Sequence, residues 1–397
     1  CGSIKDAEKV FYNLPTRSIV SWNSLLTGYV NHEHIREAFN LFCKMQCENA
    51  EANAITFVSI LNACIVAEDL EFGMAVHACA VETEFQSLTI VGNALTNMYI
   101  NCESILDAQM VFLEMREHSV VSWNTMISGL TKHGHALYAI DLFKRMQYSS
   151  VAPDAVTYVS VLSAIASTQN LYEGWIIHSD ITEMGFQFNS FMENALIDMY
   201  SKCRSLNDAW QVCNNMSSRD IVSWNSIIAT FADDDQGDKA LQLYEQMQRA
   251  GVCSDRLTFV TLLYACATLP EALEKDGSKF GSRQLNAICL EIAKALYADM
   301  SSKDLACDAF LCSSLVNVYA KCGSIPDAEN MFCLPILLYD TVAWNAMLSA
   351  YIAQGHSRKA LELYRAMLEQ RVALDNITFV CILQACSGIG SLYEGRL

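Results

Sequence analysis

The sequence is poor in proline, in basic residues and in long apolar runs, and each shortage bears on the structures or functions that the chain can have. Five prolines in 397 residues leave almost the whole chain open to helix, because a proline inside a helix costs about 3 kcal/mol. No stretch approaches the roughly 18 uninterrupted apolar residues of a membrane-spanning helix, so we expect no membrane span. Twenty-six Lys and Arg against 44 Asp and Glu give a net charge of −18, which is the opposite of the basic balance typical of nucleic-acid-binding surfaces.

The cysteines lack the spacing of a metal or disulfide protein. No two of the 17 are spaced C-x-x-C, and the H-x-E segment of a zinc deaminase is absent, so we predict reduced thiols, no metal, no cofactor and no catalytic residue. Cys43 and Cys47 could share a metal, but no histidine is in reach and two ordinary thiols are the simpler interpretation. Cys64, Cys266 and Cys386 recur at equivalent positions, where we expect buried packing.

What the chain does have is internal repetition. A Ser-Trp-Asn motif recurs at Trp22, Trp123 and Trp224 with a spacing of 101 residues, and a related Ala-Trp-Asn follows at Trp344, 120 residues later. Two further related units lie within each interval, so one interval holds repeats of 35, 35 and 31 residues. We expect ten full repeats and two partial ones, over residues 1–18, 19–53, 54–88, 89–119, 120–154, 155–189, 190–220, 221–255, 256–308, 309–340, 341–375 and 376–397.

Each repeat has the apolar periodicity of a helical hairpin. A hairpin of this size cannot cover its own apolar faces, so copies must stack. We therefore predict an all-α fold, a right-handed α-solenoid of stacked helix-turn-helix repeats that forms one tetratricopeptide-like superhelix over residues 1–397. The repeat at 256–308 carries 18 extra residues, which we place partly at 276–280 and partly around 292–306, with a prolonged second helix and a mobile loop at 301–304.

Three segments carry a resemblance to a known family: VVSWNTMISGLTKHGHALYAIDLFKRM at 120–146, NALIDMYSKC at 194–203 and KCGSIPDAENMF at 321–332. The chain resembles plant-type pentatricopeptide repeat proteins of the PLS subfamily, in which long, long-variant and short repeats alternate. The resemblance implies sequence-specific binding of single-stranded RNA along the concave face, about one base per repeat. It also implies a site-recognition factor without enzyme activity, part of a longer array, in a mitochondrion or alternatively a chloroplast, where editing or processing proteins act in trans.

The resemblance places base reading on the fifth and the last residue of each repeat. An Asn amide offers both a donor and an acceptor to a pyrimidine edge, and the last residue biases uracil against cytosine. The family's code then implies a pyrimidine-rich target, 5′-YnCUnUUnGU-3′, in which n is an unread base at the variant repeats. The variant repeats have valine as the fifth residue. The reading pairs are Asn23 with Asn53, Asn93 with Ser119, Asn124 with Asp154, Asn194 with Asp220, Asn225 with Asp255, Ser313 with Asp340, and Asn345 with Asp375.

Two further residue sets follow from the resemblance. The second residue of each reading repeat would wedge against a base, at Val20, Ile90, Val121, Phe191, Val222, Phe310 and Val342. A lysine late in the first helix would contact phosphate, at Lys132, Lys202 and Lys321. Structural alternatives remain for the wedge residues and for the reading Asn residues. An apolar residue near a helix start is more often part of the core, and an Asn there is a good helix cap. The tryptophans before the reading Asn are predicted core anchors.

A second function remains open at this level. Stacked hairpins also serve as protein scaffolds, and an acidic surface suits a basic protein partner. The net charge of −18 favours this alternative, whereas the recurring Asn with a closing Asp favours RNA. A titration with pyrimidine-rich RNA and with a basic protein distinguishes the two.

Overall fold

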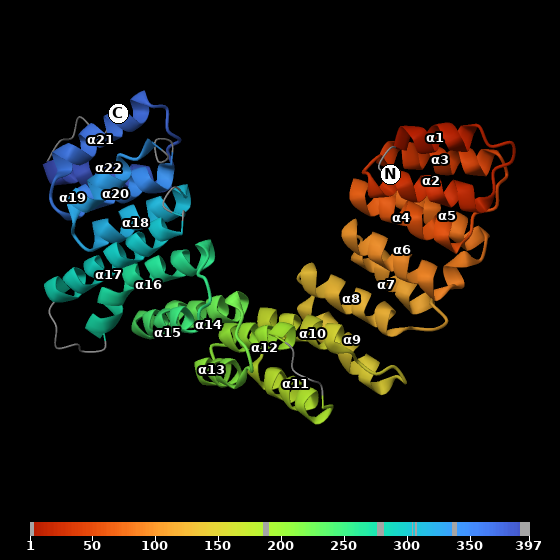
Figure 1. Cartoon of the computed structure of the whole chain (residues 1–397), viewed down its shortest axis with the longest axis horizontal. Coiled ribbons are helices and arrows are strands. Elements are labelled where there is room, and N and C mark those ends of the chain that lie inside the picture. The colour runs from red at the N-terminus through yellow and green to blue at the C-terminus, as the bar shows by residue number, and fades with distance from the viewer. Residues whose placement is uncertain are drawn as a thin grey trace. The chain divides into compact units, whose positions relative to one another are not determined.

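The computed structural model describes residues 4–185, 190–275, 282–303, 305, 308–335 and 340–389. All regular secondary structure in these ranges is helical, and no strand occurs in them (Figure 1). The predicted all-α class is confirmed. The chain divides into two compact units, Cys1–Cys203 and Arg204–Leu397, and each is described by itself.

We call the first helix of each hairpin inner and the second helix outer. The first unit begins with an outer helix, and inner and outer helices then alternate along the chain. The inner helices are α2 (Ile19–Asn31), α4 (Ala54–Ala67), α6 (Thr89–Asn101), α8 (Val120–Lys132), α10 (Ala155–Thr168) and α12 (Ser190–Lys202). The outer helices are α1 (Ile4–Tyr12), α3 (Ile35–Cys47), α5 (Leu70–Glu82), α7 (Ile105–Glu114), α9 (Ala136–Tyr148) and α11 (Leu171–Glu183), and a short 3₁₀ turn, η1 (Phe85–Ser87), follows α5.

The second unit repeats the same alternation. Its inner helices are α14 (Ile221–Asp233), α16 (Arg256–Lys275), α18 (Ala309–Lys321), α20 (Thr341–Ala353) and α22 (Asn376–Ile389). Its outer helices are α13 (Leu206–Asn215), α15 (Gly237–Arg249), α17 (Ser282–Ser302), α19 (Ile325–Phe332) and α21 (Ser357–Glu369).

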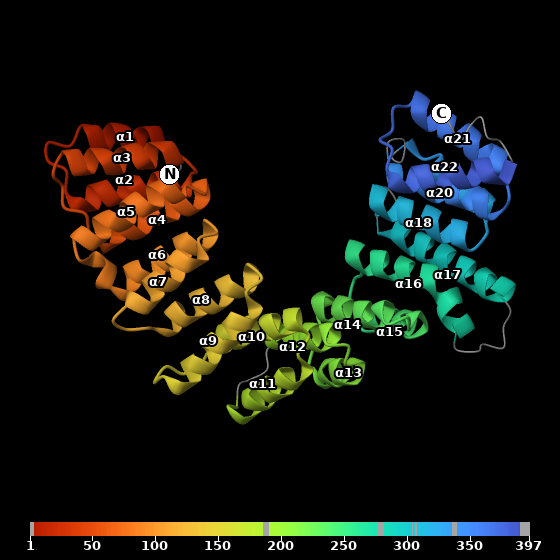
Figure 2. The same ribbon diagram turned by 180° about the vertical axis from the view of Figure 1, so that it is seen from behind.

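Stacking of hairpins builds the core of each unit. Within each unit, each inner helix packs against the next inner helix along the chain, and most outer helices lie between two inner helices, as Figure 1 and the reverse view in Figure 2 show. On α8 the stripe of Trp123, Met126, Ile127 and Leu130 is at most 6% exposed. Full burial of one such side chain stabilises the fold by roughly 1.5–3 kcal/mol. Since neighbouring hairpins supply much of this burial, each unit is an α-solenoid.

The extra residues of the repeat at 256–308 lengthen both described helices of its hairpin. Gln46 Nε2 donates to Cys79 Sγ, and Gln147 Nε2 donates to Asp180 Oδ2, each across 33 residues. The corresponding bond from Gln248 to Asp299 spans 51 residues. The difference is 18, so all the extra residues precede Asp299. They lengthen α16 to 20 and α17 to 21 residues, so the expected prolonged second helix is confirmed. The expected placement around 292–306 is wrong for the residues after Asp299. The other expected position, 276–280, lies outside the described residues.

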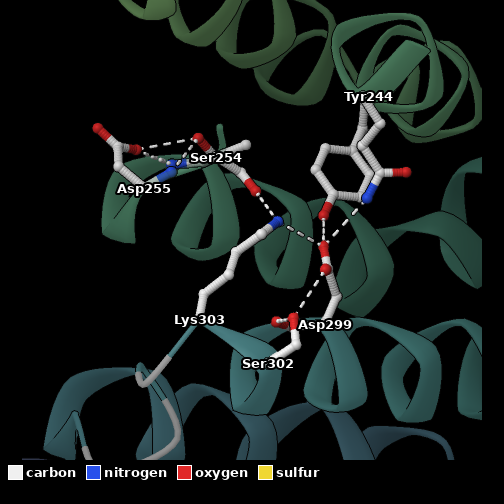
Figure 3. Close-up of polar contacts among 8 residues, drawn as sticks. Tyr244, Ser254, Asp255, Asp299, Ser302 and Lys303 are labelled. Carbon is white, nitrogen blue, oxygen red and sulfur yellow. Dashed lines mark hydrogen bonds and ion pairs between the residues drawn. The ribbon is translucent and has the colours of Figure 1, made fainter. Parts of the chain in front are cut away.

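A polar cluster fixes the far end of α17 (Figure 3). Tyr244, Gln248 and Lys303 all donate to the carboxylate of Asp299, and Lys303 Nζ also donates to Ser254 Oγ at 2.5 Å. Burial alone would raise the pKa of Asp299, but the hydrogen bonds from Tyr244 and Lys303 and the charge of Lys303 hold it below its ordinary value. Ser301 and Ser302 belong to α17, so the expected loop is wrong for these two residues. Lys303 lies in the turn after α17, where its side chain binds Asp299, and Asp304 lies outside the described residues.

Candidate nucleic-acid interface

Four of the predicted reading pairs are joined by a hydrogen bond. Asn23 Nδ2 donates to Asn53 Oδ1 at 3.0 Å, although the two residues are 30 positions apart. The same bond joins Asn124 to Asp154 at 2.9 Å, Asn225 to Asp255 at 3.0 Å and Asn345 to Asp375 at 2.9 Å. The fifth and the last residue of these repeats therefore lie side by side, where one base could reach both.

The last residue of each of these repeats also caps the next inner helix. Asp154 Oδ1 accepts from the backbone N–H of Thr157 at 2.9 Å. Asn53, Asp255 and Asp375 accept in the same way from the backbone N–H three residues later, that of Thr56, Thr258 and Thr378. Such a cap stabilises a helix by roughly 0.5–2 kcal/mol. The capping role expected as an alternative is thus real, but it belongs to the last residue. The fifth residue lies one turn inside its helix.

Four threonines complete these sites, and the sequence analysis did not predict their contact. Thr157 Oγ1 donates to Asn124 Oδ1 at 2.6 Å. Its counterparts are Thr56 on Asn23 at 2.7 Å, Thr258 on Asn225 at 2.6 Å and Thr378 on Asn345 at 2.8 Å. The signal in the sequence is a threonine three positions after the closing Asp or Asn, which is the spacing of a capping box.

The short repeats arrange their predicted readers differently. Asn93 Oδ1 is buried and accepts no hydrogen bond within the described ranges, while Ser119 binds Ser122. Ser313 is only 2% exposed and donates to the Phe310 carbonyl at 2.9 Å, while Asp340 caps α20. The structure therefore gives neither Asn93 and Ser119 nor Ser313 and Asp340 a hydrogen bond to each other. Asn194 belongs to the first unit and Asp220 to the second.

The predicted wedge residues are all exposed. Their exposed fractions run from 49% at Phe310 to 69% at Val20, and Ile90, Val121, Phe191, Val222 and Val342 lie between. The core alternative is wrong for these seven positions. It is right for the tryptophans, because Trp22, Trp123, Trp224 and Trp344 are 2–6% exposed.

The variant repeats carry an exposed apolar residue at the same second position, which the sequence analysis missed. Their side chains are 53–59% exposed, at Ile55, Val156, Leu257 and Ile377. An exposed apolar side chain therefore stands near the start of each inner helix from α2 to α22. Uniform recurrence of an apolar residue at one register position was the signal available in the sequence.

The three predicted phosphate lysines are exposed at the ends of their inner helices. Lys202 forms an ion pair with Asp198 at 2.8 Å, and Lys321 donates to the Ala267 carbonyl at 3.5 Å. Lys132 forms no hydrogen bond or ion pair with any residue that the structure describes. Of the three ammonium groups, that of Lys132 is the best placed to meet a phosphate.

Comparison with known proteins identifies the repeats. A sequence model described as the PPR repeat family matches residues 17–65, 118–167, 219–268 and 339–388, which together make up half of the chain. A PPR repeat model also matches residues 194–221 and 310–334. The chain belongs to the pentatricopeptide repeat (PPR) family.

Curated PPR relatives are proteins of Arabidopsis thaliana. Two named as mitochondrial are 32% identical over 396 residues and 30% identical over 415 residues, and one named as chloroplastic is 31% identical over 395 residues. Each match covers 100% of this chain but 55%, 44% and 46% of the relative, in that order, so the chain spans about half the length of the curated relatives it matches. These names support the organellar localisation that the family resemblance implies.

A solved PPR structure has the same fold. PPR10 in complex with an 18-nucleotide psaJ RNA element superposes with a TM-score of 0.64, at 16% identity, over 100% of this chain and 61% of that chain. The likeness confirms an α-solenoid of PPR repeats.

Two closing aspartates of the PPR repeats, Asp154 and Asp255, have pKa values below the ordinary value of an aspartate. Burial alone would raise the pKa of Asp154, but hydrogen bonds from the Thr157 backbone N–H and the Asn124 amide hold it below its ordinary value. The pKa of Asp255 is lowered against burial in the same way, by Thr258 and Asn225. An ionised carboxylate can only accept hydrogen bonds, so these sites present acceptors to a ligand.

Metal and membrane sites do not appear in the described ranges. No three His, Cys, Asp or Glu side chains there are grouped so that they could hold a metal ion. None of the helices searched there combines the length and the apolar character needed to cross a membrane. The thiols of Cys64, Cys266 and Cys386 are free and buried, as their recurrence predicted.

Proposed function

We propose that this chain binds single-stranded RNA along the N-terminal ends of its inner helices and reads about one base per repeat. The observation that carries the proposal is the hydrogen-bonded pair of Asn and closing Asp, present in three repeats and as Asn with Asn in a fourth, beside an exposed apolar residue. The exposed apolar side chains offer faces for stacking, which contributes roughly 1–3 kcal/mol per base where an aromatic takes part. The RNA-bound PPR10 structure supports this proposal at the level of the fold.

The charge of the closing residue supplies the base preference. Uracil carries an N3–H donor, whereas cytosine has an unprotonated N3 acceptor in its place, so an acceptor-only carboxylate favours uracil. Applied to all seven pairs with the RNA parallel to the chain, the family's code gives 5′-YnCUnUUnGU-3′. The C and the G, assigned to Asn93 and Ser313, rest on the family resemblance alone, because neither residue forms a hydrogen bond with the closing residue of its pair, Ser119 or Asp340.

The biological role follows from the repeat type. The second helices of the short repeats have 10, 10 and 8 residues against 13 in the first repeat of each triplet, which supports assignment to the PLS subfamily. We infer a site-recognition factor for organellar RNA editing or processing, in a mitochondrion or alternatively a chloroplast, with the chemistry supplied by partner proteins. The chain itself carries no catalytic role in this proposal.

A titration at low salt tests the proposal. The probe is 5′-UACUAUUAGU-3′, and the control is an RNA of the same composition in scrambled order. Because each mismatched base costs roughly 1–3 kcal/mol, we expect at least about tenfold tighter binding of the probe. Equal binding of the two RNAs would remove sequence reading.

The scaffold alternative is favoured by one observation, the net charge of −18. It predicts that the chain retains neither RNA but binds a basic protein, and that added salt abolishes this protein binding. That result would replace RNA binding as the function of this chain.

A further inference from the structure

Each of the four joined reading pairs belongs to a closed group of three side chains, which we call an amide clamp. A clamp consists of the fifth-residue Asn, the closing Asp or Asn, and the Thr three positions later on the next repeat. In the clamp of Asn124, Asp154 and Thr157, the three pairs of polar atoms lie 2.9, 2.6 and 2.9 Å apart. The other clamps are Asn23, Asn53, Thr56; Asn225, Asp255, Thr258; and Asn345, Asp375, Thr378.

The positions of the hydrogens in a clamp can be assigned from its partners. Thr157 Oγ1 accepts the backbone N–H of Asp154 at 3.1 Å, so its own hydrogen is available to donate. Asp154 Oδ1 already accepts from the Thr157 N–H and from Asn124 Nδ2. The Thr157 hydrogen therefore goes to Asn124 Oδ1, its closest acceptor at 2.6 Å.

Two anchors fix the amide plane of the Asn. One N–H of Asn124 is held by a carboxylate that cannot donate, and its oxygen is held by a hydroxyl hydrogen. A flipped amide would place its oxygen against the carboxylate, so only one orientation satisfies both partners. One amide hydrogen and one oxygen lone pair remain for a base. The Asn side chains are otherwise enclosed, since Asn23, Asn225 and Asn345 are only 6–8% exposed.

Helix capping alone does not explain the threonine contact. Ser122 occupies the third position of α8 and forms the capping box with Ser119, yet Asn93 of the preceding repeat receives no bond from it in the described ranges. A hydroxyl at this position can thus cap without touching the reader. In the four clamps it does both.

We propose that Thr56, Thr157, Thr258 and Thr378 are positioning residues for base recognition, each fixing the reading amide of the repeat before its own. The inference rests on the proposed RNA-binding function. It gives the variant repeats a role in reading, although their own fifth residue is a valine without hydrogen-bonding groups. The unit that discriminates a base is then a repeat together with the first turn of its successor.

The test uses Thr157→Val, which removes the hydroxyl and keeps the shape, with Thr157→Ser to restore it. Binding is measured to the ten-base probe and to its variant with A in place of U at the fourth base, which repeat 120–154 reads. We expect the preference for U to fall by about 3- to 10-fold in Thr157→Val, part of a good base contact, and to return within about twofold in Thr157→Ser. The preference for C at the third base, read by the unclamped Asn93, should stay unchanged.

A stability control separates positioning from general loosening. Asn170 caps the outer helix α11 at its N-terminus, so Asn170→Ala weakens a helix of the following repeat without removing a clamp. It should lower the melting temperature and leave the preference at the fourth base intact. If Thr157→Val does not fold, Thr258→Val with the seventh base provides the same measurement in the second unit.

The outcomes distinguish this inference from the function beneath it. A wild-type chain that prefers U at the fourth base, with the preference kept in Thr157→Val, overturns the positioning role alone. Equal loss of preference at the third and fourth bases overturns it too, because it marks a general effect. A wild-type chain that binds neither RNA overturns the proposed function, and the positioning role with it.

Discussion

Val121 and Trp123 lie two residues apart at the start of α8 and have opposite environments. Val121 is 60% exposed, whereas Trp123 is 6% exposed and packs edge-on against Phe112 at 5.1 Å. Residues two apart on a helix point to different sides, so the apolar pattern at this site serves both the core and the proposed contact with bases.

This relationship predicts a clean separation of stability from binding. Trp123→Ala should destabilise the protein by about 3–5 kcal/mol, since it leaves a large cavity. Val121→Ser should change the unfolding free energy by no more than about 0.5 kcal/mol and weaken RNA binding about 3- to 10-fold, less than the loss of an aromatic stack. Urea unfolding and RNA titration measure the two effects. A strong loss of stability in Val121→Ser would return this position to the core.

Ser119 is predicted to decide between cytosine and uracil at the third base. Ser119→Asp should shift the preference from C to U by about 1–3 kcal/mol, because a carboxylate accepts the uracil N3–H. Ser119 caps α8, and Asp caps about as well, so stability should not change. The measurement compares RNAs that differ only at the third base. If both RNAs bind equally more weakly, Ser119 is a cap and not a reader.

Asp154 is predicted to give the protein a pH-dependent increment of stability. Its folded-state pKa lies below the ordinary value of about 3.9, so its contribution is present above that value and is lost as pH falls through the folded pKa. Asp154→Asn keeps a cap without a charge. The stability advantage of the wild type over this variant should be constant from pH 7 to about pH 5 and shrink below about pH 4, as urea unfolding can show. An advantage that grows as pH falls contradicts the assignment.

The same variant tests the role of the carboxylate in base choice. With an amide in place of the acceptor-only carboxylate, Asp154→Asn should relax the preference for U at the fourth base toward either pyrimidine. The fourth base is replaced by C in the comparison RNA. An undiminished preference for U would remove Asp154 from the reading set.

Lys132 and Lys202 are predicted to differ in their contribution to RNA affinity. Lys132→Ala should weaken binding of all RNAs alike and lower the salt slope by about one phosphate contact. Lys202→Ala should have a smaller effect, because Lys202 is already paired with Asp198. Affinity measured from 50 to 200 mM salt compares the two variants. An equal effect of both would mean that the Asp198 ion pair opens on binding.

Helices and repeats were predictable from the sequence because periodicity and self-similarity are local signals. The placement of the insertion was not, because helical periodicity continues through 290–300 and gives no mark of where the extra residues lie. The bond from Gln248 on α15 to Asp299 on α17, the outer helices of neighbouring repeats, sets that register. A contact between residues 51 apart cannot be deduced from either segment alone.

The candidate site was predictable in part for the same reason. The family resemblance, applied to the repeat register, paired Asn124 with Asp154. It did not indicate that Thr157 joins them, because the threonine belongs to the next repeat. It also could not place Ser313, whose hydroxyl turns to the Phe310 carbonyl of its own helix. A short hydroxyl side chain can bind its own backbone as easily as a neighbour, and only packing decides between them.

The insertion in the repeat at 256–308 also bears on how repeat proteins of this kind evolve. The extra residues lengthen α16 and α17, and the chain recovers its register by Asp299, before the next inner helix begins at Ala309. If the chain reads RNA as proposed, the insertion leaves the spacing of the reading residues that follow it unchanged. Extra residues in the loop that carries Asp255 would instead separate Asp255 from Asn225 and break the hydrogen bond between them. A repeat protein of this kind can lengthen a hairpin while the order and spacing of its proposed reading residues stay the same.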